Sequence, residues 1–496
     1  MNSEIRRWAT VVRAQAVTGA QAPTRSVGRH RWRPSRRRMP HVDVILIALT
    51  LLAFAIASYR LGAKSFWLDE TVAGSYARMS WGHLWTVVSK SDPNMGLYYV
   101  LLRLWVIVVG HSDAAVRSLS VVLGGLSVPA IVLLGRRLFG PLAGGLAGLL
   151  LAISPFLVEY EQTARAYSLV VLLVTLSSLF FVIALEDPSP KALSAYAATS
   201  ALSVYAHYFA AFVLLVQFLT VVAVRRRSAL SPGWVLAWCG IVLLCIPEAI
   251  FAQRAGTGGI SWIPEPTIRS LFELPSRLVG GRVTAVLVAV LACYAIARTR
   301  GLRAQVWRIG FVLAWLIVPV ALTFVISRLG RPLFIPYYLI IVLPAIYLLA
   351  AAGLSRLPWR WIAAAATVAV AALSLAHVRS WDDQPSLENF RDATHYIVTH
   401  QQAGDGIIFY PHWAASGVDY YETSFHAAGP SPVPYAARAQ AAARYSRVWL
   451  VIRDADVPVA ERDQVERSLA ADYRQITSSP QFSGVTVALY RPKPLR

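Results

Sequence analysis

Charged residues are scarce in this sequence, and cysteine is almost absent. Only 15% of the 496 residues are charged, whereas 56% are hydrophobic, and the mean hydropathy is +0.51. Soluble globular domains carry about 25% charged residues, so this composition excludes that class and indicates a polytopic α-helical membrane protein. The three cysteines (Cys239, Cys245 and Cys293) all lie in apolar segments, so we predict neither a disulfide nor a thiolate metal site.

Acidic residues are also few, with 26 Asp and Glu against 47 Lys and Arg, which gives a net charge of +21. The excess is unevenly spread: residues 1–41 contain ten Arg and one Glu, and most of the remaining excess lies in short loops between apolar segments. This distribution is typical of loops held on the cytoplasmic side of a membrane. We therefore predict a disordered basic cytoplasmic arm at 1–41 and no nucleic-acid partner.

Apolar segments long enough to cross a bilayer recur through residues 42–377, the predicted transmembrane domain. Leu97–Val109 is too short to span, and we predict that it lies as an interfacial helix in the first outer loop. With this assignment, the positive-inside rule determines the direction of every span. The protein is then a multi-pass protein of the plasma (inner) membrane with a cytoplasmic N-terminus. About eleven spans are predicted: Val42–Tyr59, Val116–Gly135, Leu142–Leu157, Tyr167–Leu185, Ala192–Ala206, Tyr208–Val224, Trp234–Phe251, Val283–Ala297, Ile309–Ile326, Tyr337–Ala352 and Trp359–His377.

The last part of the chain, residues 378–496, loses both the apolar segments and the basic excess. Helical patterns at Ser386–His400 and Val459–Ala471 alternate with strand patterns at Gly406–Tyr410, Arg447–Ile452 and Val485–Tyr490. This alternation predicts a small α/β domain, which the topology places outside the cytoplasm. This domain either binds a polysaccharide acceptor or covers the site.

Polar residues that are far apart in sequence meet, by this topology, at the outer membrane face. Asp69 and Glu70 follow the first span, and charge at such a boundary tends to mark function. A carboxylate there can take the proton of an attacking hydroxyl, and cations can stabilise a leaving phosphate. The further candidates are Asp92 and Asn94 before the interfacial helix, Tyr98 within it, Glu161, Gln162 and Arg165 after the third span, and His207, Arg328, Arg331 and Tyr337 in later outer loops.

Several motifs follow one another in a characteristic order: Leu68-Asp69-Glu70, Asp92-Pro93 with Leu97-Tyr98-Tyr99, Arg117-Ser118-Leu119-Ser120, Leu134 to Gly140, Tyr160 to Tyr167, and His207-Tyr208-Phe209. In this order they resemble the bacterial glycosyltransferase family 39-type enzymes of the GT-C superfamily, which include protein-mannosyltransferase-like and aminoarabinose-transferase-like members. The resemblance is dense over residues 65–219 and loose in the later spans.

The resemblance implies that Asp69 is the catalytic base and that the donor is a sugar on a polyprenyl phosphate. Arg165, Arg328, Arg331 and Tyr337 are then candidates for the donor phosphate. Glu70, Asp92, Asn94, Tyr98, Glu161, Gln162 and His207 are candidates for substrate contacts; a structural role is the alternative for each.

Three departures from the family pattern limit this transfer of roles. Thr163 stands where many relatives have Glu, Asn94-Met95-Gly96 replaces a common His-Pro-Pro, and Tyr337 replaces an Arg. We predict no cofactor and no obligatory metal, because an Asp-Glu pair alone is not a coordination set.

The sequence thus favours a membrane glycosyltransferase. The predicted reaction moves mannose or arabinose from a polyprenyl-phosphate donor to a cell-envelope glycan, lipid or protein acceptor. The alternative is a lipid or glycan flippase or transporter, and a non-catalytic envelope-assembly subunit is a third interpretation.

Overall fold

The computed structural model describes residues 40–90, 92–226, 230–256, 262–299, 303–437, 444–478 and 480–493. Apart from Pro40 and His41, the predicted basic arm lies outside the described residues. Residues 43–496 form one compact unit, which is described here by itself.

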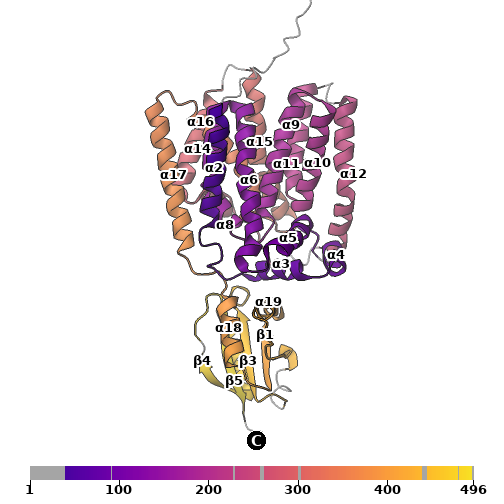
Figure 1. Ribbon diagram of the computed structural model, residues 1–496, viewed down its shortest axis with the longest axis vertical. Coiled ribbons are helices and arrows are strands. Elements are labelled where there is room, and N and C mark those ends of the chain that lie inside the picture. Colours follow the sequence, from indigo (N-terminus) through magenta and orange to yellow (C-terminus); the bar gives the residue numbers. More distant parts are fainter. Residues whose placement is uncertain are drawn as a thin grey trace, which may run out of the picture. The chain divides into compact units, whose positions relative to one another are not determined.

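Most of this unit is a bundle of long helices whose axes run in similar directions (Figure 1). Its elements are α2 (Pro40–Ser58), α6 (Asp113–Phe139), α7 (Pro141–Ala152), α8 (Pro155–Glu161), α9 (Tyr167–Glu186), α10 (Pro190–Ala206), α11 (Ala210–Arg225), α12 (Pro232–Ala255), α13 (Ile268–Val279), α14 (Arg282–Ala297), α15 (Arg303–Leu329), the 3₁₀ helix η3 (Pro336–Val342), α16 (Leu343–Leu354) and α17 (Arg360–Asp382).

The predicted spans all coincide with helices of this bundle. Among the described residues, six helices are long and apolar enough to cross a membrane, or up to eight if two bent pairs each count as one span. The bundle therefore supports a polytopic membrane protein, whereas the number eleven and the orientation stay predictions. The apolar stretch of α9 is 83% buried, and that of η3 with α16 is 89% buried. The apolar stretches of α12 and α17 are each only 17% buried. The helices α9 and α16, together with η3, therefore lie in the centre of the bundle.

Two details of the predicted spans are wrong. The segment Leu142–Leu157 is not one helix, because α7 and α8 meet at an angle of 56°; Ser154 caps α8 through the Leu157 amide and Pro155 starts it, so the first helix cannot continue. The segment before Arg282, predicted as an outer loop, contains α13, which was not predicted. The side chain of Thr267 caps it, and Leu274 and Leu278 form its buried face.

The segment between α2 and α6, which we predicted as the first outer loop, folds into three short helices. They are α3 (Leu68–Arg78), α4 (Trp81–Lys90) and α5 (Gly96–Val109), and they lie at one end of the bundle (Figure 1). With 14 residues, α5 is shorter than the roughly 20 that a span needs. It buries Tyr98, Tyr99 and Leu102 against its neighbours. Its length agrees with a helix that does not span, and its position at the membrane interface stays a prediction.

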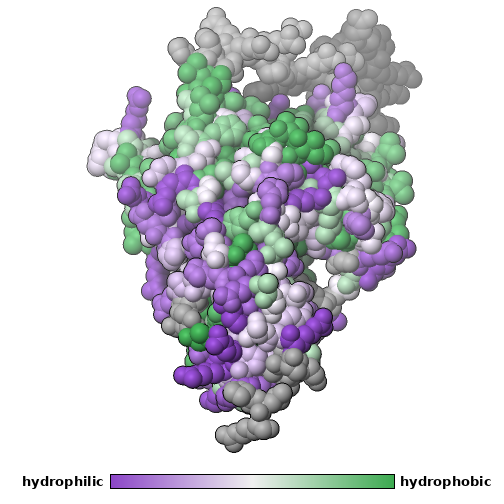
Figure 2. All heavy atoms as spheres, turned by 60° about the horizontal axis from the view of Figure 1, so that its bottom comes forward, coloured by the Kyte–Doolittle hydropathy of each residue, from purple (hydrophilic) through white to green (hydrophobic). Residues whose placement is uncertain are grey.

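The C-terminal part is a mixed five-stranded sheet in the order β2-β1-β3-β5-β4, in which β1 pairs in parallel with β2 and β3, while β5 is antiparallel to β3 and β4. The predicted α/β fold of this part is confirmed. Figure 2 shows hydrophilic side chains over this end of the molecule. The elements are α18 (Phe390–His400), β1 (Asp405–Tyr410), α19 (Ala415–Phe425), β2 (Ser431–Pro432), β3 (Arg447–Arg453), α21 (Val459–Asp472), β4 (Tyr473–Ser478) and β5 (Val485–Pro492), with 3₁₀ turns η4 (His412–Ala414), η5 (Tyr435–Ala437) and η6 (Asp454–Asp456).

Three of these elements were not predicted. The strand β2 has two residues, β4 carries polar residues on an edge, and α19 begins without a side-chain cap. The helix α17 continues past the predicted domain boundary at His377 to Asp382. The boundary itself stays a prediction.

Candidate active site

Asp69 lies in the first turn of α3, at the end of the helical bundle. Its side chain is 35% exposed, whereas that of the adjacent Glu70 is 1% exposed. The extended residue Trp67 precedes the helix, and the Leu68 amide donates a hydrogen bond of 2.7 Å to Oε2 of Glu388. Of the two neighbouring acids, only Asp69 is open to a ligand.

The accessible carboxylate of Asp69 is the first member of a polar chain. Its Oδ2 lies 3.4 Å from Nη2 of Arg165, in the loop between α8 and α9. Nη1 of Arg165 donates to the Tyr99 hydroxyl at 3.2 Å, which in turn donates to Oδ2 of Asp92 at 2.8 Å. Burial raises the pKa of Asp92, although Arg165 and the hydrogen bond from Tyr99 lower it in part. Two acids from different segments are thus linked to one arginine, Asp69 directly and Asp92 through the Tyr99 hydroxyl.

Aromatic rings line the next part of this cluster. The ring of Tyr167 lies 5.4 Å from that of Tyr337 and 6.1 Å from that of His207, and Tyr338 lies 4.9 Å from His207 (centroid distances). Burial and the positive charge of Arg165 lower the pKa of His207 to about 3. The imidazole is therefore neutral near pH 7.

Two buried donors of this cluster have no hydrogen-bond partner within the described part of the chain. The Phe209 amide donates to Nδ1 of His207, which puts the imidazole proton on Nε2, and this Nε2 is unpaired. Nε of Arg165 is unpaired as well. Since buried polar groups are normally paired, both donors are suited to an oxygen-rich ligand.

Glu70 does not occupy the position that we predicted for a substrate contact. Its carboxylate accepts from Nε and Nη2 of Arg117 at 2.8 and 2.6 Å, and from the Ala164 amide at 2.8 Å. Arg117 is itself 4% exposed and also donates to the Leu61, Lys64 and Ser65 carbonyls. The pair fastens α3 to α6, so Glu70 has no free face for an acceptor.

The remaining predicted substrate contacts are mostly buried. Tyr98 bonds the Ser120 hydroxyl at 2.9 Å, and Gln162 donates to the Tyr59 carbonyl at 3.0 Å. Asn94 accepts from the Tyr208 amide at 3.4 Å, which links the first outer loop to the turn that carries His207. Glu161 is 1% exposed and faces Gly124, where any side chain would collide with its carboxylate.

The four predicted phosphate ligands do not gather in one place. Arg165 and Tyr337 belong to the cluster around Asp69. Arg328 instead lies 3.8 Å from Glu265 and donates to the Pro266 carbonyl, and its side chain is 52% exposed. No contact among the described residues joins Arg328 or the exposed Arg331 to Asp69 or Arg165. Nor does any group of three His, Cys, Asp or Glu in the described ranges have the arrangement of a metal site.

Comparisons with known proteins agree with this architecture. Residues 93–251 match the family model described as dolichyl-phosphate-mannose-protein mannosyltransferase. The fold is similar to that of ArnT from Cupriavidus metallidurans bound to undecaprenyl phosphate, with 14% identity over 90% of this chain and 97% of that chain and a TM-score of 0.58. The fold is thus similar to that of known glycosyltransferases, and a mannosyltransferase family model matches about a third of the chain.

Two further solved structures have a similar fold. The oligosaccharyltransferase of Archaeoglobus fulgidus is 13% identical over 88% of this chain and 72% of that chain, with a TM-score of 0.53. The mycobacterial arabinofuranosyltransferase AftD is 14% identical over 91% of this chain and 40% of that chain, with a TM-score of 0.51. The comparison with curated proteins gives no match.

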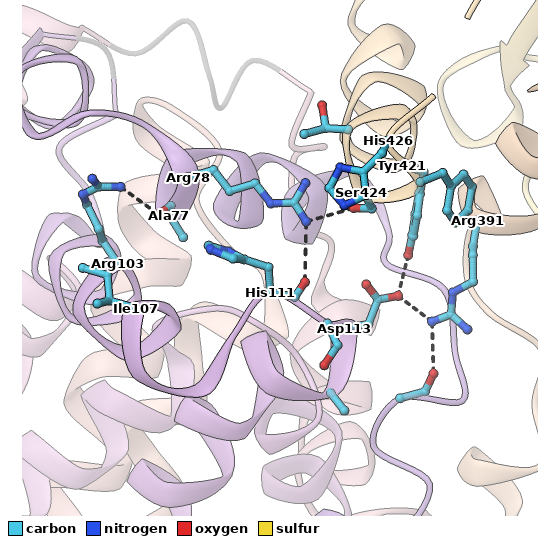
Figure 3. A pocket seen from close by; sticks show the side chains of 15 residues that line it. Ala77, Arg78, Arg103, Ile107, His111, Asp113, Arg391, Tyr421, Ser424 and His426 are labelled. Atoms are coloured by element: carbon cyan, nitrogen blue, oxygen red, sulfur yellow. Dashed lines mark hydrogen bonds and ion pairs between the residues drawn. The ribbon is translucent and has the colours of Figure 1, made fainter. Parts of the chain in front are cut away.

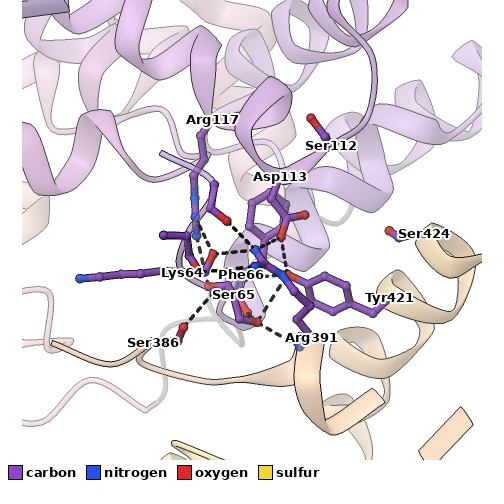
Figure 4. Close-up of polar contacts among 12 residues, drawn as sticks. Lys64, Ser65, Phe66, Ser112, Asp113, Arg117, Ser386, Arg391, Tyr421 and Ser424 are labelled. Carbon is purple, nitrogen blue, oxygen red and sulfur yellow. Dashed lines mark hydrogen bonds and ion pairs between the residues drawn. The ribbon is translucent and has the colours of Figure 1, made fainter. Parts of the chain in front are cut away.

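The protein supports its candidate site with residues to which sequence reasoning gave no role. Asp113 accepts from the Tyr421 hydroxyl at 2.8 Å and pairs with Arg391, while the Phe66 amide donates to Tyr421 at 2.8 Å (Figure 4). Glu388 is held by Arg453 of β3 at 2.7 Å. Arg117 lies in one of the motifs of the family resemblance, and that motif is a sequence signal for its importance. The partners in the C-terminal domain have no such signal, because they are more than 300 positions away from the residues that they contact.

Proposed function

We propose that this protein transfers a sugar from a polyprenyl phosphate to a hydroxyl of a cell-envelope acceptor, at the outer face of the plasma (inner) membrane. The observation that carries the proposal is the accessible Asp69 carboxylate 3.4 Å from Arg165, beside two unpaired buried donors. One carboxylate and a cluster of donors are what a base and a leaving phosphate require.

In the proposed reaction, Asp69 accepts the proton of the acceptor hydroxyl. The acceptor oxygen bonds to the anomeric carbon as the bond between that carbon and the phosphate oxygen breaks, with inversion at the carbon. The electron pair of the broken bond stays on the polyprenyl phosphate. Arg165 and Nε2 of His207 donate hydrogen bonds to that phosphate, whose charge increases as the bond breaks.

The lipid part of the donor has a matching apolar surface. A cavity of about 500 Å³ lies between α13, α14, α15 and α16, lined by side chains such as Leu274, Leu278 and Val320. These helices include the neighbours of η3, which carries Tyr337. We assign the isoprenoid chain to this cavity; the undecaprenyl phosphate bound by the similar ArnT structure supports a donor of this class.

The sugar is proposed to be mannose or arabinose. The match to a mannosyltransferase family model supports the first, and the fold similarity to an arabinofuranosyltransferase is compatible with the second. The acceptor is a cell-envelope glycan, lipid or protein. Asp92 is the predicted substrate contact that best fits the geometry, since it belongs to the polar chain of Asp69.

Sugar transfer by the purified full-length chain tests the proposal. A panel of radiolabelled polyprenyl-phosphate sugars is incubated with envelope glycans, and wild type is compared with Asp69→Asn. Glu186→Gln is the matched control, because Glu186 is an acid paired with Arg137, away from the Asp69 cluster. Loss of transfer only in Asp69→Asn, with donor binding retained, supports the proposal. Equal transfer by both variants overturns Asp69 as base, and lipid translocation without any transfer favours a transporter.

A further inference from the structure

A second cavity, which is polar and has a volume of about 980 Å³, lies between the first outer loop and the C-terminal domain (Figure 3). Its walls are the end of α3, α5, the start of α6, α18 and the end of α19. Asp69 does not line it. Arg78, which does, lies at the opposite end of α3 from Asp69, about 13 Å along the helix axis.

The walls of this cavity carry an excess of positive charge. Arg78, Arg103 and Arg391 line it together with one acid, Asp113. That acid is already occupied, because Arg391 and the Tyr421 hydroxyl both bind it. His111, His426 and several hydroxyl-bearing side chains also line the cavity. Burial and the charges of Arg78 and Arg103 lower the pKa of His111. The lining is therefore suited to an anion.

Arg103 provides an unused donor at this site. Its Nη1 donates to the Ala77 carbonyl at 3.0 Å, and its guanidinium lies 4.9 Å from the centroid of the Trp81 ring. Its Nε is buried and has no partner among the described residues. A buried guanidinium nitrogen without an acceptor is uncommon, so it favours a ligand oxygen at this point.

An exposed apolar surface adjoins the charged walls. Ile107 lines the cavity and is 64% exposed, and Leu104 and Val108, three residues before it and one after it, are 49% and 85% exposed. These side chains share one face of α5. A cationic cavity beside an uncovered apolar face has the character of a surface that meets both lipid headgroups and acyl chains.

We propose that this cavity binds the phosphate headgroup of an anionic phospholipid, whose acyl chains cover the exposed face of α5. The ligand contacts Arg78 and Arg103 on the first outer loop, and the aromatic end of α19 on the other wall. It thus joins the C-terminal domain to the loop that carries Asp69. This site is separate from the proposed donor site and does not depend on sugar transfer.

Lipid binding by the purified full-length chain, counted by native mass spectrometry, tests this inference. Palmitoyl-oleoyl phosphatidylglycerol, phosphatidylcholine of the same chains, and inorganic phosphate are each added at equal concentration. The variants are Arg103→Gln and His111→Glu; because His111 is exposed in a loop, its variant folds even if Arg103→Gln does not. The control is Arg269→Gln, an arginine on α13 that is 83% exposed and does not line the cavity.

We expect phosphatidylglycerol to bind in preference to phosphatidylcholine. Each cavity variant should weaken it about fivefold, the effect of one basic residue near an anionic lipid, and Arg269→Gln should not. Equal binding of the two lipids, or unchanged phosphatidylglycerol binding in both cavity variants, overturns the inference. Displacement of phosphatidylglycerol by inorganic phosphate at equal concentration also overturns it, because the ligand is then a soluble phosphate and not a lipid.

Discussion

The amide of Leu68 donates a hydrogen bond of 2.7 Å to Oε2 of Glu388, although 320 positions of sequence separate the two residues. Oε1 of Glu388 accepts from Arg453, and the Glu388 side chain is 1% exposed. The first turn of α3, which carries Asp69, is therefore fixed in part by the sheet of the C-terminal domain.

Glu388→Gln is expected to lower kcat about tenfold while the donor KM changes little, because Asp69 loses its exact position but the phosphate donors remain. Steady-state transfer kinetics measure kcat and the donor KM separately. The control is Glu422→Gln, an acid of the same domain on α19. A rise in KM at constant kcat would contradict a positioning role for Glu388.

Glu70→Gln is expected to destabilise the protein by about 3 kcal/mol, because it leaves the buried Arg117 without its charge partner. Thermal unfolding in detergent measures this, and Asp69→Asn should change the unfolding temperature far less. The double variant Glu70→Gln/Arg117→Gln should recover part of the loss. A Glu70→Gln protein of normal stability that no longer binds acceptor would show that Glu70 is a substrate contact after all.

Arg165→Gln is expected to reduce kcat/KM about 100-fold, the usual cost of removing one donor from a developing negative charge. Arg331→Gln provides the matched comparison, because Arg331 is exposed and belongs to a different segment. The initial rate of sugar release from the donor distinguishes them. Equal losses in both variants would mean that the phosphate reaches beyond the cluster around Asp69.

The buried His207 predicts a pH-dependent stability. Its folded-state pKa of about 3 lies below the ordinary value of 6.5, so the unfolded chain binds more protons between these values. The contribution of His207 to the free energy of unfolding is complete above pH 6.5. It is lost at about 1.4 kcal/mol per pH unit as the pH falls below that value. Unfolding at about pH 7.5 and about pH 5 should show this difference in wild type. A His207→Gln variant should show a smaller difference in stability between the two pH values. An equal difference in the variant and in wild type would contradict the lowered pKa of His207.

Metal removal is expected to leave sugar transfer unchanged. In the proposed reaction Arg165 and His207 supply the donors for the leaving phosphate, so no divalent ion is required. Transfer is measured after treatment with EDTA, and again after readdition of Mg²⁺ or Mn²⁺. Activity that disappears with chelation and returns with one of these ions would reject this expectation.

The sequence predicted the features that depend on local pattern. The apolar segments located the helices of the bundle. The Asp69 motif pointed to a carboxylate that is partly exposed and lies 3.4 Å from Arg165, while its catalytic role stays a prediction. Even the strands β1, β3 and β5 were predicted, since each has a continuous apolar run typical of buried strands.

The features that the sequence did not show depend on contacts between distant segments. Glu70 was predicted as a ligand contact because it adjoins Asp69, but consecutive helical residues face different directions, and its direction leads to Arg117. Arg328 and Arg331 were placed with Arg165 by topology alone, which specifies a membrane face but no position on it. The charge partners of α18 and α19 could not be predicted, because sequence distance says nothing about pairing.

The amides of Ser65, Phe66 and Leu68 all donate to side chains from the C-terminal domain, namely Ser386, Tyr421 and Glu388. These partners are translated after every helix of the bundle. During synthesis, the segment that leads into α3 therefore lacks its partners until the ribosome has passed residue 421. A chain that stops after α17 would contain every predicted site residue, yet it would lack the groups that fix the start of α3. Completion of this site is a late event in the biogenesis of the protein.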